Sequence, residues 1–349
     1  MSQRFAVLAL LILPAAALSQ DDAVLGKKCG EWLTILKEHK EVKFRRAALI
    51  ALEVFGPKTR GVLAGLYETL ETDAEPELRR EAALLLGRMG PDAKDAVPHL
   101  AEALKKDKAD NVREAAALAL SEKLSPFAYE HVLVMGAALK DPHAGTRAAA
   151  AVALNALGEK ARLALPQLME VAKDQKADRV PRLYAVQIVS RLQNDQPETG
   201  SILVDIVNDG QAPASLRSAA AEGLGRREKT EKAELQALGK LLTDKAVDLR
   251  RAAATALAKL GEQAAPVWPQ VQARLADEDN TVRYQLIRLA GAAARDHKEA
   301  IEALRQLALK DAHVENRLAA IVEQALEHVV VVAPRGRESP CPRSSATTA

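Results

Sequence analysis

The sequence predicts an all-α fold, a right-handed α-α superhelix (solenoid) of about nine helix pairs. The first observation is an arginine that recurs at steps of 34, 34, 34, 35, 35, 33, 33 and 34 residues. A fixed period between about 20 and 50 residues is the signature of a repeat architecture. Each arginine also opens the same alanine- and leucine-rich pattern, and an aspartate precedes most of the arginines by six residues. The nine arginines are Arg45, Arg79, Arg113, Arg147, Arg182, Arg217, Arg250, Arg283 and Arg317.

One helix of each repeat follows from the pattern V/L-R-x-x-A-A-x-A-L-x-x-L-G. We count its Val or Leu as position 0 and its Arg as position 1, number the repeats 1 to 9 by their arginines, and name this helix B. The clearest copies are residues 249–261, 146–158, 78–90 and 44–56. Apolar residues at positions 0, 4, 7, 8 and 11 give the stripe of an amphipathic helix. The glycine at position 12 indicates the end of that helix.

A second helix, helix A, is predicted between successive copies of helix B. Prolines such as Pro57, Pro98, Pro126, Pro166 and Pro269 fall before its start or in its first turn, where a missing N–H costs least. The clearest examples are Val62–Leu70, Pro98–Lys105, Pro166–Val171, Leu235–Leu242 and Ile301–Leu309.

We call the nine recurring arginines the arginine ladder. A second ladder, of aspartates, lies in the turn from helix A to helix B and consists of Asp73, Asp107, Asp141, Asp244, Asp277 and Asp311. In repeats 5 and 6 the nearest aspartates, Asp174 and Asp209, stand eight residues before the arginine, and repeat 1 has His39. An aspartate here can accept from N–H groups at the start of helix B. The arginine can fork onto an aspartate of the adjacent repeat. We therefore interpret both ladders as structural, and expect the softest joint at repeats 5 and 6.

The Asp-x5-Arg, Ala-Ala and Leu-Gly arrangement resembles HEAT repeats, and more closely the short HEAT-like repeats named after phycobilisome lyases. The resemblance covers Gly30 to about His328. It implies a helical solenoid and says little about activity, because one scaffold serves many partners. The signatures of tetratricopeptide and ankyrin repeats are missing.

The chain ends differ from the repeats. Residues 1–19 resemble a secretory signal peptide, with Arg4, an apolar run over 5–13 and a small-residue cleavage site. We expect an exported protein, periplasmic or extracellular, without a membrane span in the mature chain; an uncleaved anchor or a buried first helix is the alternative. Residues 20–328 form the predicted solenoid. In the tail, 329–349, Val329–Val332 extend the last helix or pair as a strand, and the polar residues from Pro334 are expected to be disordered.

Composition restricts the function. Among 349 residues, 48% are hydrophobic but only 3% aromatic, so the core must consist of Ala, Leu and Val. The net charge is +2; without Arg4 and the basic tail the repeats carry about −1, which argues against a nucleic-acid partner. The two cysteines, Cys29 and Cys341, are expected to be free thiols or to form an intermolecular bridge.

No chemistry is evident in the motifs. HEAT-like deoxyhypusine hydroxylases hold iron through His-Glu dipeptides, and none of the seven histidines here is followed by Glu. Nucleophile-elbow, phosphate-loop, zinc-protease and dinucleotide-binding motifs are also missing. The sequence thus predicts no catalytic residue, no metal site and no cofactor.

The remaining candidate is a partner surface on helix B, expected on the concave side of the stack. Position 6 is apolar in repeats 1 to 4, with Ile50, Leu84, Leu118 and Val152, and polar in repeats 5 to 8. Arg46 and Arg80 stand at position 2 of the first two repeats. An apolar row with basic neighbours suggests a groove for a peptide or protein. The alternative is that the neighbouring helix B partly covers position 6.

The sequence therefore predicts a monomeric, non-catalytic scaffold or adaptor in the cell envelope or the extracellular space. The alternative is a docking or regulatory module of an enzyme or sensor complex. A HEAT-like enzyme and a nucleic-acid binder are less favoured.

Overall fold

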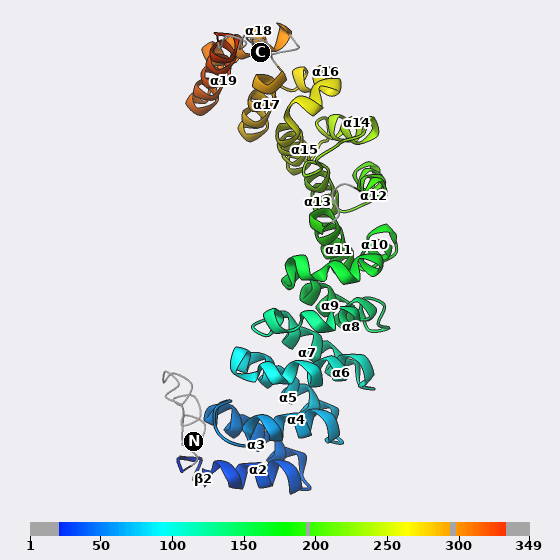
Figure 1. Cartoon of the computed structure of the whole chain (residues 1–349), viewed down its shortest axis with the longest axis vertical. Helices are drawn as coiled ribbons and strands as arrows, with labels where there is room; N and C mark the ends of the chain where they lie inside the picture. Colours follow the sequence, from blue (N-terminus) through cyan, green and yellow to red (C-terminus); the bar gives the residue numbers. More distant parts are fainter. Residues whose placement is uncertain (1–20, 193–195, 294–297, 333–349) are drawn as a thin grey trace, which may run out of the picture. The chain divides into compact units, whose positions relative to one another are not determined.

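Helix pairs make up nearly all of the chain, as the computed structural model shows for residues 21–192, 196–293 and 298–332 (Figure 1). The chain divides into two compact units, Met1–Ile202 and Leu203–Ala349, which are described separately. The predicted signal peptide and the tail beyond Val332 lie outside the described residues.

Repeats 1 to 5 belong to the N-terminal unit. Their helices A form one layer and their helices B another, and each helix B packs on the next (Figure 1). The pairs are α2 (Cys29–Glu38) with α3 (Val42–Phe55), α4 (Val62–Thr72) with α5 (Pro76–Met89), α6 (Val97–Lys106) with α7 (Asp110–Ser121), α8 (Val132–Ala138) with α9 (Ala144–Ala156), and α10 (Leu165–Lys173) with α11 (Arg179–Leu192).

Repeats 7 to 9 belong to the C-terminal unit and repeat the same arrangement, and the division falls within α12, so that the rest of repeat 6 belongs to this unit as well. The pairs are α12 (Pro197–Asn208) with α13 (Ala214–Leu224), α14 (Lys232–Leu241) with α15 (Val247–Leu260), α16 (Trp268–Gln272) with α17 (Asn280–Ala293), and α18 (Lys298–Lys310) with α19 (Val314–Val332).

Glycines end several B helices, as the pattern predicts. Gly56, Gly90 and Gly261 directly follow α3, α5 and α15 and have positive φ, a conformation that side chains disfavour. Short 3-10 helices then lead into the next helix A: η2 (Gly90–Ala96), η3 (Ser125–Phe127), η4 (Tyr129–His131), η5 (Gly158–Ala164) and η6 (Gly261–Val267).

Small residues let the B helices approach closely. Position 4 is a fully buried alanine in repeats 1 to 4, and position 8 a fully buried leucine. At position 9, a Cβ added to Gly87 would lie 2.8 Å from Cα of Ala119, which is position 7 of the next repeat. Gly225 and Ala256 show the same relation at 2.5 Å. Position 9 therefore faces the following repeat and position 7 faces the preceding one.

A β-hairpin at the start of the described chain was not predicted. Strands β1 (Ala23–Val24) and β2 (Lys27–Lys28) are antiparallel, and Trp32 donates from Nε1 to the carbonyl of Val24 at 2.9 Å. The turn residues Leu25 and Gly26 both have positive φ. Such a turn usually carries Asn or Asp where this chain has Leu25, so the sequence lacks the usual signal.

The last described helix continues four residues beyond residue 328, where the sequence places the end of the solenoid. The backbone of α19 continues to Val332, so Val329–Val332 extend the last helix and do not form a strand.

Cys29 is a free thiol in the first turn of α2. Its side chain is fully buried, and burial raises the pKa of the thiol. Because the Cys29 thiol is buried, it cannot reach a second chain to form the intermolecular disulfide that the sequence leaves open. Cys341 lies outside the described residues.

Candidate partner-binding surface

The arginines of helix B bind the aspartates of the following repeat. Arg79 donates from Nε to Oδ2 of Asp107 at 2.7 Å and from Nη2 to Oδ1 at 2.8 Å. Two parallel bonds of this kind are the strongest form of carboxylate recognition. The same fork, with distances from 2.7 to 3.2 Å, joins Arg45 to Asp73, Arg113 to Asp141, Arg250 to Asp277 and Arg283 to Asp311.

The third guanidinium nitrogen binds the arginine's own repeat. Nη1 of Arg79 donates to the carbonyl of Asp73, six residues earlier, at 2.8 Å. The carboxylate of Asp73 in turn accepts from the N–H of Glu75 at 2.9 Å, which holds the turn before helix B. One arginine thus closes the turn of its own repeat and fixes the turn of the next.

His39 takes the aspartate position in repeat 1. Its Nδ1 accepts from the N–H of Glu41 at 3.1 Å, and its carbonyl accepts from Nη1 of Arg45 at 2.9 Å. A histidine suffices for these two contacts, whereas the fork needs a carboxylate.

The arginines of repeats 4 to 6 depart from the pattern because the turns of repeats 5 and 6 are longer. Arg147 pairs with Asp178, at 2.6 Å from Nε, and not with the expected Asp174. Asp174 and Asp209 still accept an N–H two residues on, both at 2.9 Å. The next two arginines turn Nε toward a carbonyl ten residues earlier, Arg182 to Ala172 at 3.2 Å and Arg217 to Val207 at 3.0 Å. The division at Ile202 falls within α12, the first helix of repeat 6, and the sequence predicts the softest joint at repeats 5 and 6.

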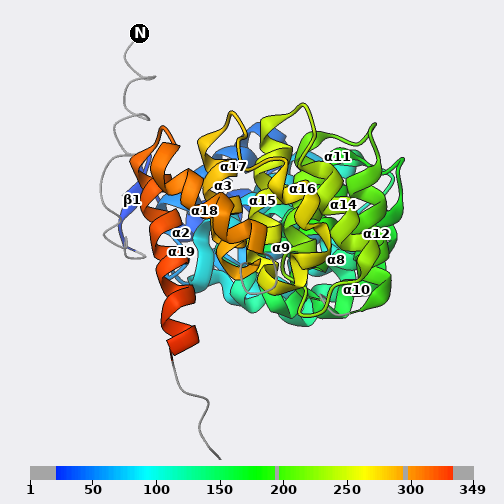
Figure 2. The same cartoon turned by 90° about the horizontal axis from the view of Figure 1, so that it is seen from above.

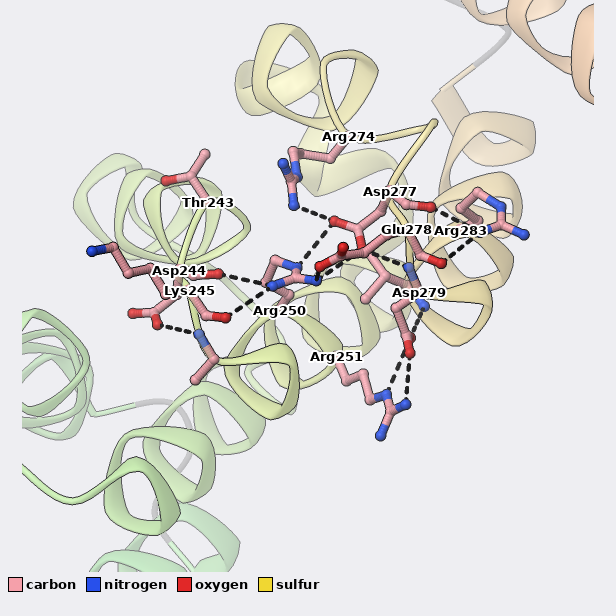
Figure 3. Close-up of polar contacts among 12 residues, drawn as sticks. Thr243, Asp244, Lys245, Arg250, Arg251, Arg274, Asp277, Glu278, Asp279 and Arg283 are labelled. Carbon is pink, nitrogen blue, oxygen red and sulfur yellow. Dashed lines mark hydrogen bonds and ion pairs between the residues drawn. The ribbon is translucent and has the colours of Figure 1, made fainter.

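Asp277 lies at the centre of the densest part of the ladder (Figure 3). Its side chain is fully buried, and it accepts from Arg250, from Arg274 and from the N–H of Asp279. Burial raises the pKa of Asp277, while these donors lower it, and the net direction is downward. The forked arginines are thus bound to carboxylates, as an internal network requires and a track for a polyanion does not.

The predicted partner residues at position 6 lie in a row on α3, α5, α7 and α9. Ile50 is 52% exposed, and Leu84, Leu118 and Val152 are half-buried. The neighbouring helices thus cover part of the row, as the alternative interpretation expects, but leave an apolar strip open.

The charged residues beside this row are paired with one another. Arg46 donates from Nε to Glu81 at 2.8 Å, and Arg88 donates from Nε to Glu53 at 2.8 Å. Arg80 lies 3.6 Å from Glu77. Arg46 and Arg80 therefore flank the row as members of ion pairs, and the strip carries little net charge.

Metal and membrane sites are not evident in the part of the chain that the structure describes. No group of three or more His, Cys, Asp or Glu residues there could hold a metal ion. No helix among residues 21–192, 196–293 and 298–332 has the length and apolar character to cross a membrane.

Comparisons with known proteins agree with this geometry. The family model described as HEAT repeats matches residues 31–121. An engineered protein has a similar structure, with a TM-score of 0.61, 18% identity and 93% of each chain covered. The Escherichia coli protein YibA gives a TM-score of 0.53 and 20% identity over 83% of this chain and 99% of that one. No curated protein sequence matches the chain.

A longer solenoid is also similar. The karyopherin Kap121p, solved bound to the extreme C-terminus of the protein phosphatase Cdc14p, gives a TM-score of 0.54 at 17% identity over 93% of this chain and 40% of Kap121p. The resemblance to HEAT repeats is confirmed over residues 31–121, where the family model matches, and the similar solved structures show that the chain has a helical solenoid fold.

The buried aspartates of the ladder should make the free energy of unfolding decrease in acid. For Asp107, Asp141, Asp277 and Asp311, burial raises the pKa, but hydrogen bonds from arginine and backbone N–H groups outweigh it and lower the folded value. This stability is fully present above the unfolded pKa of about 3.9 and is lost as the pH falls through the folded values. In urea unfolding between pH 6 and 2, the free energy of unfolding should therefore fall more steeply with decreasing pH for the wild type than for Asp141→Asn.

Glu130→Gln is the matched control for this measurement, because the Glu130 side chain is exposed and lies outside the ladder. It should keep the wild-type slope. If the free energy of unfolding of Asp141→Asn fell with pH as steeply as that of the wild type, the Asp141 carboxylate would not contribute to the loss of stability in acid.

Proposed function

We propose that this protein is a non-catalytic scaffold or adaptor that binds an apolar peptide segment on the helix-B row of its N-terminal unit. The observation that carries the proposal is the open strip formed by Ile50, Leu84, Leu118 and Val152. The packing of the repeats explains the full burial of positions 4 and 8, but it does not require a large apolar residue at a partly exposed position in four successive helices.

The spacing of the row sets the form of the partner. Packed helices lie about 8–10 Å apart, so successive row residues recur at about this distance. A helical partner advances about 10.5 Å in seven residues at 1.5 Å each. An extended partner in the polyproline II conformation advances about 9.3 Å in three residues at 3.1 Å each, and every third side chain then points to the same face. We expect apolar anchors at every seventh residue of a helix, or at every third residue of an extended segment.

The charges around the row make the partner amphipathic and not strongly charged. Because Arg46 and Glu81, and Arg88 and Glu53, already neutralise each other, a highly acidic peptide gains little. Kap121p, whose fold is similar, is bound to the terminal segment of another protein, which supports a peptide as the type of ligand.

Binding would be tested with a displayed peptide library selected on the full chain. Leu84→Glu and Leu118→Glu should each weaken selected peptides by at least about tenfold, since one buried apolar anchor contributes about 1.5–3 kcal/mol. Gln187→Glu, at the same position of repeat 5, is the matched control and should bind normally. Peptides that bind Leu84→Glu and Leu118→Glu as tightly as the wild type would contradict the proposal.

We also propose that the protein acts outside the cytoplasm, in the envelope or the extracellular space. The support is the sequence of residues 1–19, with its charged start, apolar run and small-residue cleavage site. Mass spectrometry of chain isolated from the native cell should find an N-terminus near Gln20. Cytoplasmic chain that retains Met1 would oppose this placement.

A further inference from the structure

The last helix presents an apolar face to solvent. On α19, Val314, Leu318, Ile321 and Val322 are 56%, 57%, 50% and 53% exposed. Single exposed apolar residues are common, but four on one face of one helix form a patch. Terminal repeats of solenoids usually carry a polar outer face, because no further repeat covers them.

The exposed face is the one that stacks on a following repeat elsewhere in the chain. Ile321 occupies position 5 of the repeat pattern, and the position-5 residues Leu49, Ala83, Ala117, Ala151, Ala221, Ala254 and Ile287 are at most 1% exposed. Leu318 occupies position 2, from which Arg46 reaches Glu81 of the next repeat. The row on α19 is therefore a stacking surface that no other repeat covers among the residues that the structure describes.

In the part of the chain that the structure describes, Arg317 lacks the contact that the forked arginines make with an aspartate of the following repeat. Its Nη1 binds the carbonyl of Asp311 at 2.7 Å, as in the other rungs. Within the described residues, no carboxylate of a following repeat lies within ion-pair distance of its guanidinium. Among the described residues, both the apolar packing and the arginine–aspartate pairing between successive repeats therefore end at α19.

We propose that a second copy of this chain covers the face, and that two molecules pair through α19 about a two-fold axis. An apolar row is complementary to itself, which is what a two-fold interface requires. Val314, Leu318 and Ile321 follow one another at steps of four and three residues, the spacing of a seam between paired helices. The sequence alone predicts a monomer; the uncovered face is what changes that expectation.

The length of α19 favours pairing. It has 19 residues, against 14 in α15 and α17, and Figure 2 shows it running past α17 and α18. Five extra residues add about 7.5 Å of helix at 1.5 Å per residue.

Other occupants fit less well. In a head-to-tail arrangement Arg317 would meet repeat 1, which offers His39 in place of an aspartate and has its Nδ1 already bound to Glu41. The chain's own residues 333–349 contain only Ala, Pro and Cys as apolar residues and include Arg335, Arg337 and Arg343, so they cannot match the row. The face lies outside the helix-B row of the N-terminal unit, so the two proposals stand or fall separately.

The test is the molar mass of the full chain by sedimentation velocity over a range of concentrations. The wild type should form a dimer, and Ile321→Asp should raise its dissociation constant at least about thirtyfold, the effect of losing one interface hot spot. Leu163→Asp, at a residue 65% exposed in the N-terminal unit, is the matched control and should still dimerise. Leu318→Lys gives a second variant on the same face should Ile321→Asp lose helicity by circular dichroism.

A mixing experiment tests the symmetry. Near a two-fold axis Ile321 faces its own copy, so Ile321→Asp and Ile321→Lys should each be monomeric and should form a heterodimer when mixed. A monomeric wild type, a dimer unaffected by both α19 variants, or a growing series of larger species would each overturn the proposal.

Discussion

The interlock between an arginine and two successive turns is the interaction on which the rest of the structure depends. One guanidinium binds the carbonyl of its own turn through Nη1 and the carboxylate of the next turn through Nε and Nη2. Removing one partner of a buried ion pair costs about 3–5 kcal/mol, because the other charge stays buried without compensation. Each repeat is thereby held to its neighbour at a fixed register, and small residues at positions 9 and 7, such as Gly87 and Ala119, let the B helices approach closely.

This joint also decides where function can lie. The forked arginines are bound to carboxylates, so the ladder offers no free charge for a ligand. Position 6 of helix B has no part in the joint, and its apolar residues in repeats 1 to 4 are available to a partner. At α19 no described repeat follows, and the residues that face a following repeat elsewhere in the chain are exposed. Both proposed contacts thus follow from the same repeat geometry.

Much of the fold could be predicted from sequence, because it depends on local patterns that recur nine times. The positions of the helices, the glycine ends at Gly56, Gly90 and Gly261, and the roles of Arg79 and Asp107 all follow from spacing. The choice of Asp178 over Asp174 by Arg147 does not, because it depends on the path of a longer turn. The hairpin at Leu25 could not be predicted either, because its turn lacks the Asn or Asp that usually marks such a turn.

The candidate surfaces were less predictable than the fold. Periodicity identified Leu84 and Leu118 as outside the core pattern, but their half-burial depends on how closely two B helices approach. The pairing of Arg46 with Glu81 joins two repeats and is invisible to a single-repeat pattern. The exposed face of α19 could not be predicted, because residues at the same positions of other repeats are buried, and exposure depends on whether another helix covers them, as none does among the described residues.

The most direct test of the interlock is a pair of double-mutant cycles measured by urea unfolding. Arg79→Met is combined with Asp107→Asn in one cycle and with Asp73→Asn in the other. We expect a coupling energy of at least about 1 kcal/mol for Arg79 with Asp107, and a clearly smaller one for Arg79 with Asp73, whose carbonyl and not its carboxylate accepts a hydrogen bond from Arg79. Equal couplings, or none with Asp107, would contradict the claim that this arginine ties each repeat to the next.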